Sequence, residues 1–149
     1  MNDCGNETLD TQQNLARVID ELLSEREQVL VTFCRVAAVD DAMDSEARRQ
    51  LLQRFCEILV DYSALWHFEI FRYLKEHRDE YPHAISTAVK HEVKIVQASE
   101  DAVVFNDKYD PANHDLSFEQ LDHDLSVLGE ALAARIDAED QILSAMVVD

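Results

Sequence analysis

Apolar residues recur along this chain at spacings of three and four, which is the period of an amphipathic helix. Short polar stretches separate four such segments, which predict helices over about 11–39, 46–75, 82–105 and 117–147. Long helices with short connections predict an all-α fold, an antiparallel four-helix bundle. Residues 1–10 are polar and are expected to form a flexible N-terminus ahead of a single domain over 11–149.

Local signals mark the ends of these segments. Asp44 or Ser45 suits the N-cap of the second helix, and Pro82 suits the first turn of the third. Ser117 and Gln120 have capping-box spacing, which predicts the start of the fourth helix at Ser117. The third segment has a polar middle, and its predicted apolar positions are Ile85, Ala88, Val89, Val93, Val96, Ala102, Val103 and Phe105.

The most apolar stretch is Phe55–Leu74, which contains neither Gly nor Pro. Its length is compatible with a membrane span, a buried helix or a partner-binding helix. Polar residues interrupt it every few positions, at Glu57, Asp61, His67, Glu69 and Arg72. Because a charged residue near the bilayer centre costs roughly 2.5–3.5 kcal/mol, a membrane span is excluded. The pattern predicts a helix that is apolar on more than one side.

Composition agrees with long helices and restricts the function. The chain has 149 residues, and its 2 Gly and 2 Pro are too few for the turns of a multi-stranded β fold. The net charge of −18 disfavours direct contact with nucleic acid and favours basic partners. Cys34 and Cys56 fall on apolar faces and are expected to be buried. No signal peptide is recognisable, so the cytoplasm is the expected compartment.

Catalytic and metal-binding motifs are largely missing from the sequence. A di-iron bundle needs two Glu-x-x-His pairs, and only Glu80–His83 has that spacing, across a predicted loop and Pro82. His67 is the one histidine clearly inside an apolar helix. No nucleophile elbow or Gly-rich phosphate loop occurs. We therefore expect no enzyme activity, no metal and no cofactor, with a metal-binding bundle as a minor alternative.

One face of the second helix could contact a partner. Asp61, Leu65 and Phe68 stand at i, i+4 and i+7, which places them on one side. An acid beside apolar groups is typical of a helix that docks a basic, amphipathic partner. The alternative interpretation is that Asp61 is an ordinary solvated residue and His67 a core-edge histidine.

Several motifs in collinear order resemble those of one family. Leu59–Tyr62 followed by His67-Phe68 is similar to LVDYxSAGHFxxY, the signature of the regulator of sigma D (Rsd/AlgQ) family of anti-sigma factors. The stretch Val18–Arg26 resembles the family's first-helix motif, and 128–140 resembles its block LGEALEARFxLED. The matches cover about residues 15 to 145.

The resemblance implies a helical bundle that binds the C-terminal, promoter −35-reading domain of the primary sigma factor of RNA polymerase. It implies that the partner-binding residues are Asp61 and Phe68, with Val18, Leu22 and Arg26 as companions and Ser63, Tyr62 and Phe71 as weaker candidates. The alternative function is that of an adaptor or regulator of another cytoplasmic protein, such as a metabolic or stress enzyme.

The chain departs from the family pattern at two places. Trp66 stands where the family has Gly, and Glu21-Leu22 stands where the family has Arg-Trp. The large side chain lost from one helix and gained on the other could be a compensating exchange across one interface. Alternatively, the surface is retuned and the partner or the affinity differs.

Overall fold

The computed structural model describes residues 3–38, 44–113 and 116–149, and every regular element in these ranges is helical. The elements are α1 (Asp3–Ala37), α2 (Ser45–Leu65), the π-helical turn η1 (Trp66–Phe71), α3 (Arg72–Glu76), α4 (Pro82–Lys108) and α5 (Leu121–Val148). The all-α bundle expected from the sequence is thus confirmed. Val39, where the first helix was predicted to end, lies outside the described residues.

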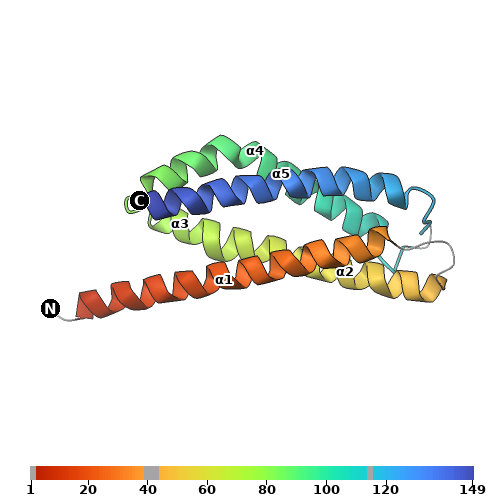
Figure 1. Ribbon diagram of the computed structural model, residues 1–149, viewed down its shortest axis with the longest axis horizontal. Helices are drawn as coiled ribbons and strands as arrows, with labels where there is room; N and C mark the ends of the chain where they lie inside the picture. The colour runs from red at the N-terminus through yellow and green to blue at the C-terminus, as the bar shows by residue number, and fades with distance from the viewer. Residues whose placement is uncertain (1–2, 39–43, 114–115) are drawn as a thin grey trace.

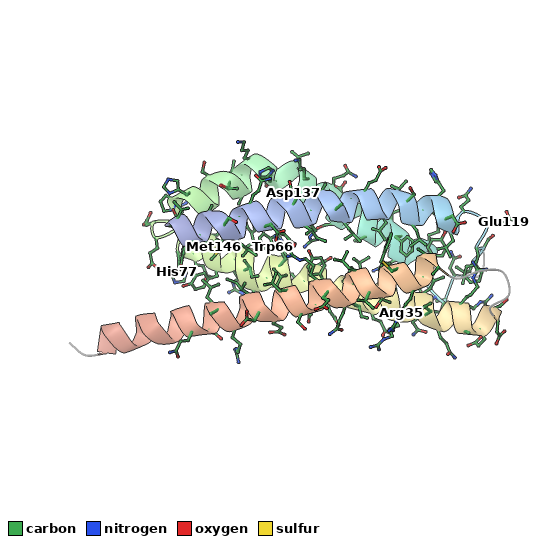
Figure 2. All side chains as sticks on the ribbon, viewed as in Figure 1. Arg35, Trp66, His77, Glu119, Asp137 and Met146 are labelled. Atoms are coloured by element: carbon green, nitrogen blue, oxygen red, sulfur yellow. The ribbon has the colours of Figure 1, made fainter. Side chains whose placement is uncertain are left out.

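The helices form two pairs that stack on each other. The α4–α5 pair makes the most extensive helix–helix contact, and α1 with α2 the next. The chain reverses direction between successive long elements, so that α1 and α4 run one way and α2–α3 and α5 the other (Figure 1). One core cluster is shared by all of them, and Trp66, labelled in Figure 2, is buried within it.

The second predicted helix is present but contains a π turn. Its buried residues Tyr62, Trp66, Ile70 and Leu74 are each four positions apart. Four residues of an α-helix turn through about 400°, so such a row drifts by roughly 40° per step away from the core. The wider turn of η1 rotates less per residue and takes back that drift. This keeps Ile70 and Leu74 completely buried.

Helix α4 packs against α5 through its small residues. Its buried positions are Ala84, Ala88, His91, Ala98, Ala102 and Phe105. Alanine allows two helix axes to approach closely, and His91 is held by a hydrogen-bond contact of 2.9 Å between its Nε2 and Oε1 of Gln141. The valines of this segment lie outside the core, since Val89, Val93, Val96 and Val103 are all exposed.

Side chains fix several helix ends. The Asp44 carboxylate accepts a hydrogen bond from the Glu46 N–H at 3.4 Å, which confirms the predicted N-cap of α2. Asp149 accepts bonds of 3.0 Å from the backbone N–H groups of His83 and Ala84, and thereby caps α4 from the end of α5. These bonds tie the end of α5 to the start of α4.

Three local predictions need correction. The first helix begins at Asp3 rather than near Thr11. The fourth predicted helix, α5, begins at Leu121 and not at Ser117, because the Ser117 hydroxyl accepts a hydrogen bond from the Glu119 N–H in a turn that precedes the helix. Cys34 is exposed, since the core-facing positions around it are Thr32 and Val36. Cys56 is partly buried, and desolvation raises the pKa of its thiol to about 12.

A carboxylate holds the end of α4 to the start of α5. Asp124 accepts from Lys108 Nζ at 2.7 Å and from the Tyr109 hydroxyl at 2.6 Å. Desolvation raises the pKa of Asp124, but the hydrogen bonds from Lys108 and Tyr109 outweigh it and hold the pKa below its usual range. A lowered carboxyl pKa contributes stability above the unfolded-state pKa of about 4, and this contribution is lost as the pH falls through the folded-state value.

The variant Asp124→Asn is therefore expected to be about 1 kcal/mol less stable than the parent chain at pH 7. The difference should shrink as the pH falls from about 4 toward the lower folded-state pKa of Asp124, because the folded parent then loses the same charge. Urea unfolding at pH 7 and at about pH 3 measures the difference. Asp122→Asn, an exposed acid in the same first turn of α5, is the control and should change little. A deficit of Asp124→Asn that did not depend on pH would contradict the assignment.

Candidate functional site

The outward side of α2 and η1 carries an acid and an exposed aromatic ring. Asp61 is exposed, and Phe68 is 62% exposed although it is a large apolar side chain. Val60 is 51% exposed beside Asp61, and Glu57 is exposed one turn before it. We call Glu57, Val60, Asp61 and Phe68 the acid–aromatic face. The two residues that the family resemblance ranked first therefore both lie on accessible surface.

A groove runs from this face toward the end of α4. Its volume is about 510 Å³, and it is lined by Gln53, Cys56, Glu57, Val60, Asp61, Asn106, Tyr109, Asp110 and Pro111. Its lining combines carboxylates with apolar groups. A basic side chain with a long aliphatic stem can place its stem on Val60 and its charge beside Asp61.

Helix α1 adds negative charge to the other flank of Asp61. Desolvation, and then the nearby charges of Glu21 and Asp61, raise the pKa of Glu25. Its Oε2 atom is buried and has no hydrogen-bond partner among the described residues. Three carboxylates at one seam repel one another, so a basic partner would relieve that repulsion on binding. The sequence prediction overlooked Glu21 and Glu25, although their i, i+4 spacing was visible.

The aromatic end of the face is ordered by ring contacts. The His67 ring meets Phe68 edge-on at a centroid distance of 5.0 Å and lies 6.3 Å from Phe71. Phe71 is half-buried, with Lys75 Nζ 4.8 Å above its ring. These contacts hold Phe68 in place while leaving most of it in solvent. His67 is exposed, so the suggestion of a core-edge histidine was wrong.

Beneath the face, a polar network passes through the middle of the bundle. Arg135 of α5 donates to Glu139 at 3.0 Å and reaches Ser63 of α2 and Ser99 of α4 at 3.4 and 3.3 Å. The Tyr62 hydroxyl donates to Glu139, and the Arg135 guanidinium lies 5.0 Å above the Tyr62 ring. Arg135 and Glu139 are 1% and 0% exposed.

Arg26 of α1 completes this network. Its guanidinium lies 3.7 Å from Glu139 and 2.8 Å from Asp140. Desolvation raises the pKa of Glu139, and the two guanidiniums with the Tyr62 hydroxyl act in the opposite direction. Desolvation is also the main reason that the pKa of Tyr62 is raised. All four long helices are joined at this point.

The remaining predicted site residues do not belong to an open surface. Leu22 is 0% and Val18 8% exposed, so both are core residues and neither can offer a contact to a partner in this conformation. Arg26 is engaged with α5. Ser63 and Leu65 are half-buried. The structure thus places Asp61 and Phe68 on the exposed face, Leu65 and Phe71 at its edges, and the first-helix companions below it.

The exchange between Leu22 and Trp66 concerns the core. Both are buried in the same cluster, and α1 contacts η1. The rings of Phe33 and Phe55 fix the register of α1 against α2, with centroids 6.0 Å apart. Leu22 lies about three turns before Phe33 in α1, and Trp66 lies about three turns after Phe55 in the second predicted helix. Because the two helices run in opposite directions (Figure 1), Leu22 and Trp66 lie at the same level of the bundle. This register favours the compensating exchange over a retuned surface.

Metal-binding and membrane-spanning features are both missing from the part of the chain that the structure describes. No group of three or more His, Cys, Asp or Glu residues there could hold a metal ion. Within the same ranges, no helix combines the length and the apolar character needed to cross a membrane. Buried Arg135 and Glu139 were not predicted as site residues, although both lie in the block 128–140 that resembles the family and have i, i+4 spacing.

An acidic helical bundle with an exposed acid–aromatic face is the class that this geometry defines. The chain belongs to the Rsd/AlgQ family, because the family model described as regulator of RNA polymerase sigma(70) subunit, Rsd/AlgQ, matches residues 1–147. Curated relatives carry the name regulator of sigma D. One from Yersinia pseudotuberculosis serotype O:1b (strain IP 31758) is 29% identical over 130 residues, covering 85% of this chain and 77% of the relative.

Two further relatives have the same name. The protein of Yersinia enterocolitica serotype O:8 / biotype 1B (strain NCTC 13174 / 8081) is 28% identical and covers 85% of this chain and 78% of the relative. That of Enterobacter sp. (strain 638) is 29% identical and covers 86% of this chain and 79% of the relative. The family resemblance read from the sequence is thereby confirmed.

Proposed function

We propose that this protein is a non-catalytic, cytoplasmic anti-sigma factor that captures the basic C-terminal, −35-reading domain of the primary sigma factor. Family membership and the shared name regulator of sigma D support a sigma factor as the partner. The observation that carries the proposal is the joint exposure of Asp61 and Phe68 on one helix of a protein with net charge −18.

The proposed mechanism is stoichiometric occlusion. A domain that grips DNA phosphates is rich in Arg and Lys, and an acidic surface attracts such a domain at enhanced rates. Asp61 pairs with one of those cations, helped by Glu21, Glu25 and Glu57. Phe68 supplies the apolar anchor, since a few aromatic side chains carry most of the energy of an interface. The captured domain can then bind neither promoter DNA nor core polymerase.

Truncation of either anchor should weaken capture strongly. Asp61→Ala and Phe68→Ala are each expected to raise the Kd for the isolated C-terminal domain of the primary sigma factor at least about tenfold, a loss of about 1.4 kcal/mol or more. Isothermal titration calorimetry measures this directly. Both residues are exposed, so the variants should keep the parent's unfolding midpoint.

Matched controls are available on exposed positions elsewhere. Glu119→Ala removes one negative charge from the turn before α5, and Val147→Ala trims an apolar side chain at the end of α5. Neither should change the Kd by more than about twofold. Unchanged affinity in both Asp61→Ala and Phe68→Ala would remove the acid–aromatic face from the proposal.

The adaptor function remains the second candidate. A pull-down from lysate followed by mass spectrometry separates the two functions. Recovery of RNA polymerase sigma factor supports the proposed function. Recovery of a metabolic or stress enzyme without any polymerase component would favour an adaptor.

A further inference from the structure

Helix α4 exposes a row of valines that neither the bundle core nor the acid–aromatic face uses. Val89, Val93, Val96 and Val103 are 67%, 81%, 48% and 59% exposed, and Val104 beside them is 66% exposed. The opposite side of α4 is buried through its alanines. We call these five residues the valine row. β-Branched residues are poor helix formers, so helix propensity does not account for them on an exposed helix side.

The spacing within the row is that of a helix–helix seam. Val89, Val93, Val96 and Val103 are separated by four, three and seven positions, the a/d repeat of a coiled coil. Glu100 occupies the position between Val96 and Val103 where the repeat calls for a further apolar residue. Alongside lies a groove of about 630 Å³, lined by His67, Ile95, Val96, Ser99, Glu100, Val103 and Val104. Such a groove can accept side chains from a second helix.

Charge is distributed unevenly along this side of α4. Lys90 and Lys94, with Glu92 between them, accompany the first valines, whereas Glu100, Asp101 and Asp107, followed by Lys108, accompany the last ones. The first half of the helix is therefore net positive and the second half net negative, which makes the two halves complementary. Within a chain of net charge −18, this helix has nearly balanced charges.

We infer that the valine row is a self-association surface, on which α4 of a second copy lies antiparallel about a two-fold axis close to Val96. In this arrangement each Lys90/Lys94 half faces the Glu100/Asp101 half of the other copy. A parallel, in-register pair would instead set Lys94 against Lys94 and Glu100 against Glu100. An isologous contact of this kind closes as a dimer and does not form filaments.

The first test measures association of the full chain. Sedimentation velocity from low micromolar to near-millimolar protein should show a reversible monomer–dimer equilibrium. Val93→Glu should weaken the dimer at least about tenfold, because it buries an unpaired charge in the seam. Val147→Glu introduces the same charge on an equally exposed valine of α5 and should have a much smaller effect. Both variants should keep the parent's helical circular dichroism.

The second test separates pairing from net charge. Lys94→Glu and Glu100→Lys should each weaken the dimer several-fold, although they change the net charge in opposite directions. The double variant Lys94→Glu/Glu100→Lys, which has the parent's net charge, should recover the parent's dimer affinity. A chain that stays monomeric over the whole range overturns the inference, as does equal weakening by Val93→Glu and Val147→Glu. Loss of sigma-domain capture by Val93→Glu without any self-association of the parent chain would assign the row to the partner site and also overturn it.

Discussion

The variant Arg135→Met is expected to be less stable than the parent chain by about 3–5 kcal/mol, the usual cost of removing one member of a buried ion pair. Arg135 is 1% exposed and holds Glu139, Ser63 and Ser99 at once. Without it, the Glu139 carboxylate keeps only the Tyr62 hydroxyl and the more distant Arg26. Urea unfolding followed by circular dichroism measures the difference at pH 7.

A matched pair on the surface is the control. Arg72 and Glu76 are also an i, i+4 pair, at 3.1 Å, but both are exposed. Arg72→Met should therefore cost less than about 0.5 kcal/mol. In the Arg135→Met background, Glu139→Gln should recover part of the loss, because it removes the uncompensated charge. An equal effect of Arg135→Met and Arg72→Met would show that the buried network contributes no more than a surface pair.

The second large effect concerns Leu22 of α1 and Trp66 of η1, where a large side chain has moved from one helix to the other relative to the family pattern. Trp66→Gly alone should cost about 3–5 kcal/mol, since it leaves a large cavity in the core. Leu22→Trp alone should also be destabilising, because an indole does not fit beside Trp66. The double variant restores the family's arrangement and should be more stable than the sum of the two losses predicts, by at least about 1 kcal/mol.

A double-mutant cycle with a distant partner tests whether this coupling is local. Leu52 is buried in α2, about 20 Å along the helix from Trp66. Leu22→Trp combined with Leu52→Ala should be additive within about 0.5 kcal/mol. Additivity in the Leu22/Trp66 cycle as well would mean that the two departures from the family pattern are unrelated.

The helical fold followed from the sequence because its signals are local. A period near 3.6, a scarcity of Gly and Pro, and caps such as Asp44 act within a few residues. The π turn did not follow, because it results from a row of buried residues with a constant spacing of four. That row becomes visible only when burial of Tyr62, Trp66, Ile70 and Leu74 is known.

The orientation of α4 shows a limit of periodicity. This helix has two sides that hydrophobicity alone could send inward, one of alanines and one of valines. The apolar positions read from the sequence include Ala88 and Ala102 as well as the valines, so they do not choose between the two sides. The alanine side faces α5, because the small alanine side chains allow the two helices to pack closely.

The candidate site was partly predictable for a similar reason. Asp61 and Phe68 could be named from the motif resemblance, and both are exposed. Leu22 matched a motif too, but a motif does not tell a core position from a surface position. The network of Tyr62, Arg135 and Glu139 joins residues far apart in the sequence, so its pairing depends on the packing of α2 against α5.

Trp66 also gives this protein a built-in optical reporter. It is the single tryptophan of the chain, it is 1% exposed, and it lies in the turn that carries Phe68. An indole in an apolar environment emits at shorter wavelength than one in water. Emission excited selectively in tryptophan therefore follows, without any attached dye, the state of the segment on which the proposed capture depends.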